Sequence, residues 1–212
     1  RGGERARTIR LLFPTAEEVG LVGARAYVNE IAVPAIDAGE ERIVGMISLE
    51  MLGYFSDEPG SQTVPAGGLP DLIEIPDKGN FIAIVGILPH AGFHVPLATQ
   101  MQRAAPDLRI VSTGLIPTPL PDMARSDHGA FWAAGIPAVM LTDTANFRNP
   151  HYHQETDRIG TLDFDRFTLV VRAVAGSVHR LAGPVGGVDG GKDGASTPGH
   201  VGCAAARRSR RR

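Results

Sequence analysis

The stretch NFIAIVGIL at residues 80–88 is a continuous run of apolar and β-branched side chains, and RIVGMISLEML at residues 42–52 has much the same character. Short runs of this kind are typical of strands that are covered on both faces of a sheet. We therefore expect both runs to be central strands. Similar runs predict further strands at residues 8–14, 108–114 and 136–142.

Helical patterns alternate with these strands, at residues 15–31, 95–105, 128–135 and 162–182. In the first of them, Thr15 and Glu18 have the capping-box spacing, which predicts that the helix begins there. Strands that alternate with helices favour an α/β fold, with a mixed or parallel sheet between helices. Residues 53–79 are rich in Gly, Pro and Asp and predict a long loop, and loops of this length often carry function.

The composition indicates one folded domain with a tail. A length of 212 residues with 43% hydrophobic content suits a single ordinary domain, which we place at residues 1–183. Residues 184–212 are Gly-rich, end in RRSRRR and hold almost no large apolar side chains, so we expect them to be disordered. The tail carries five Arg and one Lys against two Asp, which leaves residues 1–183 near −6 from a total of −2. This mildly acidic domain gives no electrostatic reason to expect a nucleic-acid partner.

Cys203 is the only cysteine and lies in the tail, which excludes an intrachain disulfide and a thiolate metal cluster. Any metal must therefore bind to His and carboxylate side chains. No run of 18 apolar residues is present, so the sequence predicts no membrane-spanning helix. The chain begins with Arg1 and not with Met, and we expect it to be truncated at its N-terminus, which leaves its localisation open.

Three glutamates are candidates for chemistry. Glu17 and Glu18 follow the first predicted strand, where one could bind a metal while the other holds a water molecule. Glutamate is also favoured in a first helical turn for purely structural reasons, so both interpretations stay open. Glu50 interrupts an apolar strand near its C-terminal end, which is where open α/β sheets place their ligand sites. A carboxylate buried there needs a metal, a basic partner or solvent.

Histidines occur in two informative segments. NPHYHQETD at residues 149–157 follows a strand, and its histidine and carboxylate side chains suit zinc, although a plain surface loop is an equal alternative. His151 and His153 are two residues apart, so only one of them should reach a given metal. HAGFH at residues 90–94 has the spacing of a zinc-binding helix but lacks the accompanying glutamate. In SDHGAFW at residues 126–132, Ser126 or Asp127 is expected to cap the following helix.

Three segments in order resemble the M28 family of metallopeptidases, the co-catalytic zinc aminopeptidases. They are LLFPTAEEVGLVGARAYV at residues 11–28, MISLEMLGYF at 46–55 and the stretch from SDHGAFW to LDFDR at 126–166. The resemblance covers residues 8–182. It implies a three-layer α/β/α sandwich with a central mixed, mostly parallel sheet, and two zinc ions that share a bridging water. The implied activity is removal of N-terminal residues from peptide substrates.

The same resemblance implies a role for each candidate residue. Glu17 matches the general base, and Glu18 beside it matches a zinc ligand. Glu50 takes the position of a carboxylate ligand to the other zinc, where many members have Asp. His153, in an H-x-x-x-D pattern, matches the last histidine ligand, and Tyr152 sits where some relatives place a residue that assists the tetrahedral intermediate.

The family carries an H-x-D segment and a bridging Asp upstream of the position of Thr8, and this chain has neither. We therefore expect a fragment that lacks the family's N-terminal elements, binds zinc weakly and has little or no peptidase activity alone, because catalytic zinc takes three protein ligands. The alternatives are a non-catalytic, peptidase-like binding domain, or glutaminyl cyclase or carboxypeptidase chemistry on the same scaffold.

Overall fold

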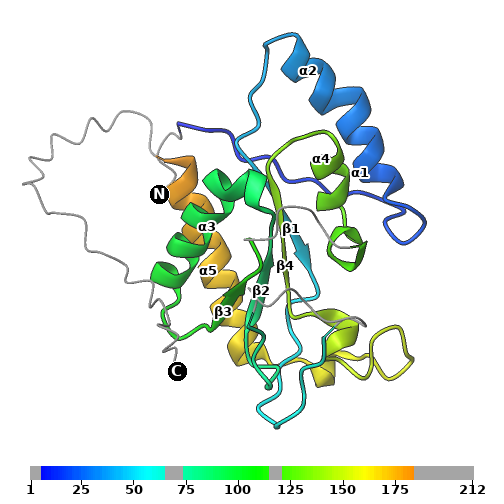
Figure 1. Cartoon of the computed structure of the whole chain (residues 1–212), viewed down its shortest axis with the longest axis vertical. Coiled ribbons are helices and arrows are strands. Elements are labelled where there is room, and N and C mark those ends of the chain that lie inside the picture. Colours follow the sequence, from blue (N-terminus) through cyan, green and yellow to red (C-terminus); the bar gives the residue numbers. More distant parts are fainter. Residues whose placement is uncertain (1–5, 65–73, 115–120, 184–212) are drawn as a thin grey trace, which may run out of the picture.

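The computed structural model describes residues 6–64, 74–114 and 121–183, and within them a four-stranded sheet lies between two layers of helices (Figure 1). The strands are β1 (Met46–Glu50), β2 (Ile82–Val85), β3 (Ile110–Ser112) and β4 (Ala138–Thr142). Their order across the sheet is β1-β4-β2-β3; β1 and β4 are parallel, β2 and β3 are parallel, and β2 and β4 are antiparallel. The predicted α/β fold with a mixed, mostly parallel sheet is confirmed.

The helices divide between the two faces of this sheet, which confirms the three-layer arrangement (Figure 1). On one face lie α3 (Ala91–Ala104) and α5 (Phe164–Ala182), whose buried side chains share a core with β2 and β4. The other face carries α4 (His128–Ala133) and a continuous helical segment formed by α1 (Val22–Tyr27), the π-helix η1 (Val28–Ala32) and α2 (Val33–Asp37). The 3-10 turns are η2 (Leu88–His90), η3 (Pro121–Ala124), η4 (Ala145–Phe147) and η5 (Ile159–Thr161).

Local sequence explains why these helices form and stop where they do. In α5 the buried residues Val170, Ala173 and Ser177 recur at helical spacing, and the carboxylate of Asp163 accepts the backbone N–H of Arg166 at 2.9 Å as an N-cap. α4 ends at Ala133 and is followed by Gly135, whose φ of +71° is the left-handed conformation that favours glycine after a helix. No helix in the described part of the chain has the length and apolarity needed to cross a bilayer.

The N-terminal segment differs from its prediction. The strand expected at residues 8–14 is wrong: the segment has no ladder partner in the described sheet, and Leu11 and Phe13 are 78% and 88% exposed. A strand requires a neighbour, which a sequence window cannot reveal. The capping box is also wrong, because Leu21, at φ +59°, occupies the N-cap position and the helix begins only at Val22.

The two apolar runs behave differently from each other. β2 lies inside the sheet with all four residues buried, as expected. β1 was expected to be central too, and this is wrong, because β1 is an edge strand of the described sheet and its Leu49 is 56% exposed. The strands expected at 108–114 and 136–142 are present but shorter, and the helix expected at 95–105 begins earlier, at Ala91.

The long loop expected at 53–79 contains no helix or strand in its described parts, residues 53–64 and 74–79. The tail at residues 184–212 lies outside the described residues, so the proposed domain boundary stays a prediction.

Candidate active site

A cavity of about 500 Å³ lies at the C-terminal ends of β1 and β4. Its wall includes all five residues to which the resemblance gives a role, namely Glu17, Glu18, Glu50, Tyr152 and His153. They come from three separate segments: the turn before α1, the end of β1, and the loop after η4. The fold therefore brings together side chains that lie up to 136 positions apart in the sequence, the separation of Glu17 from His153.

Glu18 and His153 meet directly. Nε2 of His153 lies 3.1 Å from Oε1 of Glu18, although the two residues are 135 positions apart in the chain. Both side chains are largely exposed, at 70% for Glu18 and 55% for His153. Exposed pairs of this type contribute only about 0–1 kcal/mol to stability, so the contact is not one that the fold depends on. Because both side chains are exposed, an imidazole nitrogen of His153 and a carboxylate oxygen of Glu18 are accessible at the cavity.

Glu50 is half-buried at the end of β1 and is held by a serine. Its Oε2 accepts a hydrogen bond of 3.0 Å from Oγ of Ser126, which lies 3.0 Å from Oγ of Ser48. Burial raises the pKa of Glu50, and the hydrogen bond from Ser126 partly offsets this. Ser126 therefore orients a carboxylate and does not cap α4.

The expected side-chain cap by Asp127 is wrong as well. Asp127 occupies the N-cap position of α4 but already has helical backbone angles, φ −49° and ψ −31°. A side-chain cap needs the extended backbone that lets the carboxylate turn back to the following N–H groups. Burial raises the pKa of Asp127, and its Oδ1 has no hydrogen-bond partner among the described residues.

Glu17 lies in a negative environment at the cavity wall. Burial raises the pKa of its carboxyl, and the nearby charges of Glu50 and Glu18 raise it further. A carboxylate with a raised pKa is a better proton acceptor near neutral pH, which suits a general base.

Arg125 is a functional candidate that the sequence reasoning missed. Its guanidinium donates to Oδ1 of Asn146 at 3.4 Å and to the hydroxyl of Tyr152 at 3.5 Å. Its positive charge also acts to lower the pKa values of Glu17 and Tyr152, against the larger effect of burial, which raises both. The only sequence signal was a basic residue directly before the SDH motif.

Backbone strain is concentrated at this cavity. The described non-glycine residues with positive φ are Ala16, Leu21, Met51, Thr144, Ala145 and His153. All of them line the cavity except Ala16, which directly precedes Glu17. Each such residue costs on the order of 1–3 kcal/mol, and conformations of this kind are retained preferentially at functional sites.

The donor atoms suit zinc, but the described residues do not complete a zinc site. Among them, no group of three or more His, Cys, Asp or Glu side chains lies close enough together to hold an ion. Catalytic zinc takes three protein ligands. We therefore assign no catalytic step to a metal held by these residues alone.

The other histidines that the sequence analysis singled out do not line this cavity. Nδ1 of His151 is 3.0 Å from Oγ1 of Thr156, and His151 is not part of the cavity wall. His90 and His94 are buried at the start of α3, and burial lowers the pKa of each imidazole. Neither is part of the cavity wall.

Comparisons with known proteins place the chain near peptidases of one family. The model of peptidase family M28 matches residues 1–73. The uncharacterized protein YfbL of Escherichia coli is 37% identical over 131 residues, which cover 61% of this chain and 39% of that protein. Leucine aminopeptidase 1 of Trichophyton equinum is 25% identical over 185 residues, which cover 85% of this chain and 41% of that protein.

Among solved structures, BSAP, a zinc aminopeptidase from Bacillus subtilis, has a TM-score of 0.52 at 20% identity, covering 79% of this chain and 34% of that one. At this identity the match shows a shared fold. The chain spans about two fifths of the length of the curated relatives it matches.

Proposed function

Because the chain belongs to peptidase family M28, we propose that it forms part of the catalytic domain of a zinc-dependent aminopeptidase, which removes N-terminal residues from peptides. The observation that carries this proposal is the cavity in which Glu17, Glu50 and Tyr152 surround the contact of Glu18 with His153. The names of the matched relatives support the same activity.

The roles follow from position and charge. Glu17 acts as the general base: it accepts a proton from the water that attacks the scissile carbonyl, and its raised pKa favours this transfer. Tyr152 donates a hydrogen bond from its hydroxyl to the carbonyl oxygen as negative charge develops there, and Arg125 beside it adds positive potential. Tyr152 and Arg125 both line the cavity.

The metal-binding part of the proposal is divided between two positions. Glu18 and His153 would contribute to one zinc ion and Glu50 to the other, while the remaining ligands would come from outside the described residues. Zinc bound by these residues and further ligands would supply a Lewis acid that polarises a carbonyl oxygen. With two ligands at one position and one at the other, the chain alone should bind zinc weakly and turn over little or no substrate.

An aminopeptidase assay tests the activity. We expect this chain alone to release little or no product from leucyl-4-nitroanilide in the presence of zinc. A fusion in which the part of the Escherichia coli relative that precedes its matched region comes before residue 1 should gain activity, and Glu17→Gln should reduce that activity at least about 100-fold, as for the loss of a general base. Glu155→Gln, an exposed change in the loop of His153, is the matched control. Equal activity with Gln at position 17, in a fusion that unfolds at the same temperature, would show that the assigned base is wrong.

One observation favours a second function. The absence of a three-ligand group among the described residues is also what a non-catalytic peptidase-like domain would show. Such a domain would bind peptides without zinc, and Glu17→Gln would not affect the fusion.

A further inference from the structure

Asp143 and Arg148 lie beneath the cavity, and the roles proposed above use neither. Their exposed fractions are 1% and 6%, and the nearby charge of each affects the pKa of the other. Buried charges need hydrogen bonds as well as an opposite charge to compensate for lost hydration. The hydrogen bonds that these two make connect the segments that carry the candidate metal ligands.

Asp143 joins the end of β4 to the turn that follows Glu50. Its Oδ2 accepts the backbone N–H of Tyr54 at 2.8 Å, and its own N–H donates to the carbonyl of Met51 at 2.6 Å. Its Oδ1 accepts the N–H of Ala145 at 3.0 Å, which holds the turn after β4. The carboxylate of Asp143 thus holds both the turn at Tyr54 and the turn at Ala145, although Asp143 and Tyr54 are 89 positions apart in the chain.

Arg148 holds the same turn from the other side. Its Nη1 donates to the carbonyl of Tyr54 at 3.3 Å and to that of Phe81 at 2.9 Å, and the guanidinium lies 4.5 Å from the centre of the Phe81 ring. Its Nε donates to Oε1 of Gln62 at 3.0 Å. The backbone of Tyr54 is therefore fixed through its N–H by Asp143 and through its carbonyl by Arg148.

The segments held in this way are strained. Met51, directly after Glu50, has φ +46°, and Thr144 and Ala145 have φ +78° and +47°. Left-handed conformations of non-glycine residues persist only where surrounding contacts enforce them. The carboxylate of Asp143 holds the N–H groups of Tyr54 and Ala145, and its backbone N–H holds the carbonyl of Met51. Loss of the carboxylate would therefore release Tyr54, and with it the turn that follows Glu50.

Arg148 also stands at the start of the loop that carries His153. The N–H groups of Arg148 and Asn149 both donate to the carbonyl of Ala145, at 3.0 and 2.8 Å, and the N–H of Tyr152 donates to the carbonyl of Asn149 at 3.2 Å. Short-range hydrogen bonds through Ala145 and Asn149 therefore connect Asp143 and Arg148 to Tyr152, the residue before His153.

We propose that Asp143 and Arg148 are positioning residues, which fix the turn after Glu50 and the loop of His153 relative to each other so that both candidate ligands face one cavity. The proposal rests on the function proposed above for these ligands. It goes beyond that function because it assigns the relative geometry of two segments to two buried residues of opposite charge.

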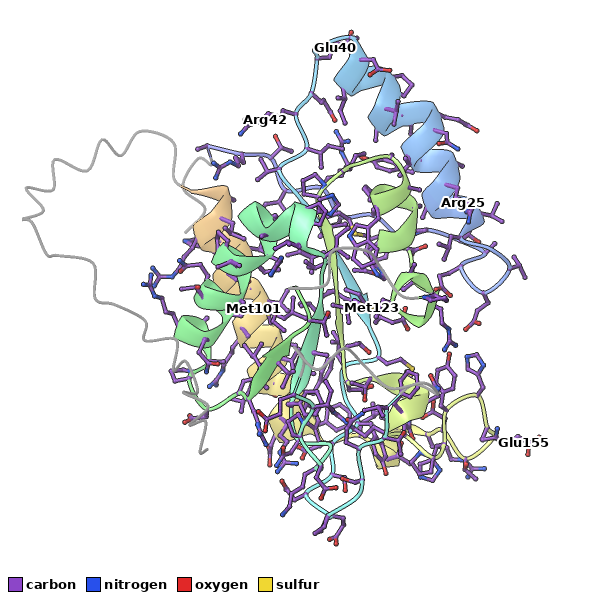
Figure 2. The ribbon with its side chains drawn as sticks, viewed as in Figure 1. Arg25, Glu40, Arg42, Met101, Met123 and Glu155 are labelled. Carbon is purple, nitrogen blue, oxygen red and sulfur yellow. The ribbon has the colours of Figure 1, made fainter. Side chains whose placement is uncertain are left out.

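Methionine methyl groups give a local test that needs no metal. The chain has five methionines, of which Met51, Met123 and Met140 line the cavity. Met101 belongs to α3 and lies in the core that α3 and α5 share with the sheet. Figure 2 shows Met101 and Met123 on opposite sides of the sheet. In protein labelled at the methionine methyl carbon, Asp143→Asn should displace the Met51 signal by more than its linewidth and should displace the His153 ring signals, with the Met101 signal unchanged.

Three further variants separate positioning from general destabilisation. Glu41→Gln changes a carboxylate that accepts hydrogen bonds from Arg10 and does not line the cavity, so it should leave Met51 and His153 unmoved. Arg148→Lys keeps the charge but not the fork of donors, so it should displace the same signals less than Arg148→Met does. Unmoved Met51 and His153 signals in Asp143→Asn would overturn the proposal, as would an equal displacement of Met101. Failure of zinc to bind the wild-type chain would count against the proposed function and leave this test unaffected.

Discussion

Acidification should destabilise the native protein through His128, and a single substitution should remove this effect. His128 is fully buried, with Nε2 donating to the carbonyl of Met123 at 2.7 Å and its ring packed edge-on against Trp132 at 4.4 Å. Its Nδ1 has no hydrogen-bond partner among the described residues. Burial lowers the pKa of His128 to about 4, from an ordinary value of 6.5.

The size and sign of the effect follow from this difference. Between pH 6.5 and about pH 4 the unfolded chain binds a proton at His128 that the native protein does not bind, so the free energy of unfolding falls as the pH falls. The contribution of His128 is fully present above the unfolded pKa and is lost at the folded one. A difference of roughly 2.5 pKa units corresponds to about 3 kcal/mol.

His128→Gln is the informative variant, because its amide can still donate to the Met123 carbonyl but does not titrate. Urea unfolding followed by fluorescence of the single tryptophan gives the free energy of unfolding at pH 7.5 and pH 4. We expect the difference between wild type and variant to shift by about 3 kcal/mol in favour of the variant at the lower pH. Substitution of the exposed His179 by Gln should produce no such shift. A wild-type-to-variant difference that is the same at both pH values would refute the reasoning.

Further predictions concern stability around the site and at one tight contact. Ser126→Ala removes the donor to Glu50 and should lower the free energy of unfolding by about 1 kcal/mol in urea titrations at pH 7, and an unchanged midpoint would contradict the assigned hydrogen bond. Gly114→Ala should destabilise by about 1–3 kcal/mol, because a Cβ there would clash with Nε2 of the buried His94. Gly92→Ala, with nothing within 4 Å of the added carbon on α3, should instead stabilise by about 1 kcal/mol, and thermal unfolding of the pair would show opposite shifts.

Local pattern was enough to predict most of the regular elements. The continuous apolarity of β2 and β4 and the helical spacing of α5 are local properties that survive in the fold. The segment at 8–14 has the same apolar character but no ladder partner in the described sheet, so its strand did not form. The predicted capping box at Thr15 and Glu18 is absent because Gly20 and Leu21, at φ +107° and +59°, form a turn, and the helix begins only after it, at Val22.

The residues of the candidate site also divide into those that could be predicted from the sequence and those that could not. Glu17, Glu18, Glu50, Tyr152 and His153 could be nominated because the motifs that contain them are short and ordered along the chain. The partners that orient them could not, since their roles depend on contacts between distant segments. Ser126 looks like a helix cap in sequence and instead holds Glu50 across 76 positions, and nothing local suggests that Asp143 and Arg148 bind the turn at Tyr54.

Zinc titration of the chain, read from the ring signals of its histidines, tests the central claim most directly. The account predicts weak, saturable zinc binding, in the micromolar range or weaker, which moves the His153 signals. Glu18→Ala should abolish this binding, because Glu18 and His153 supply the oxygen and nitrogen donors. Glu155→Gln, at the outer end of the same loop in Figure 2, should bind as the wild type does. Zinc binding that leaves His153 unmoved, or a pair of tightly held zinc ions that persists through purification of this chain, would contradict the account.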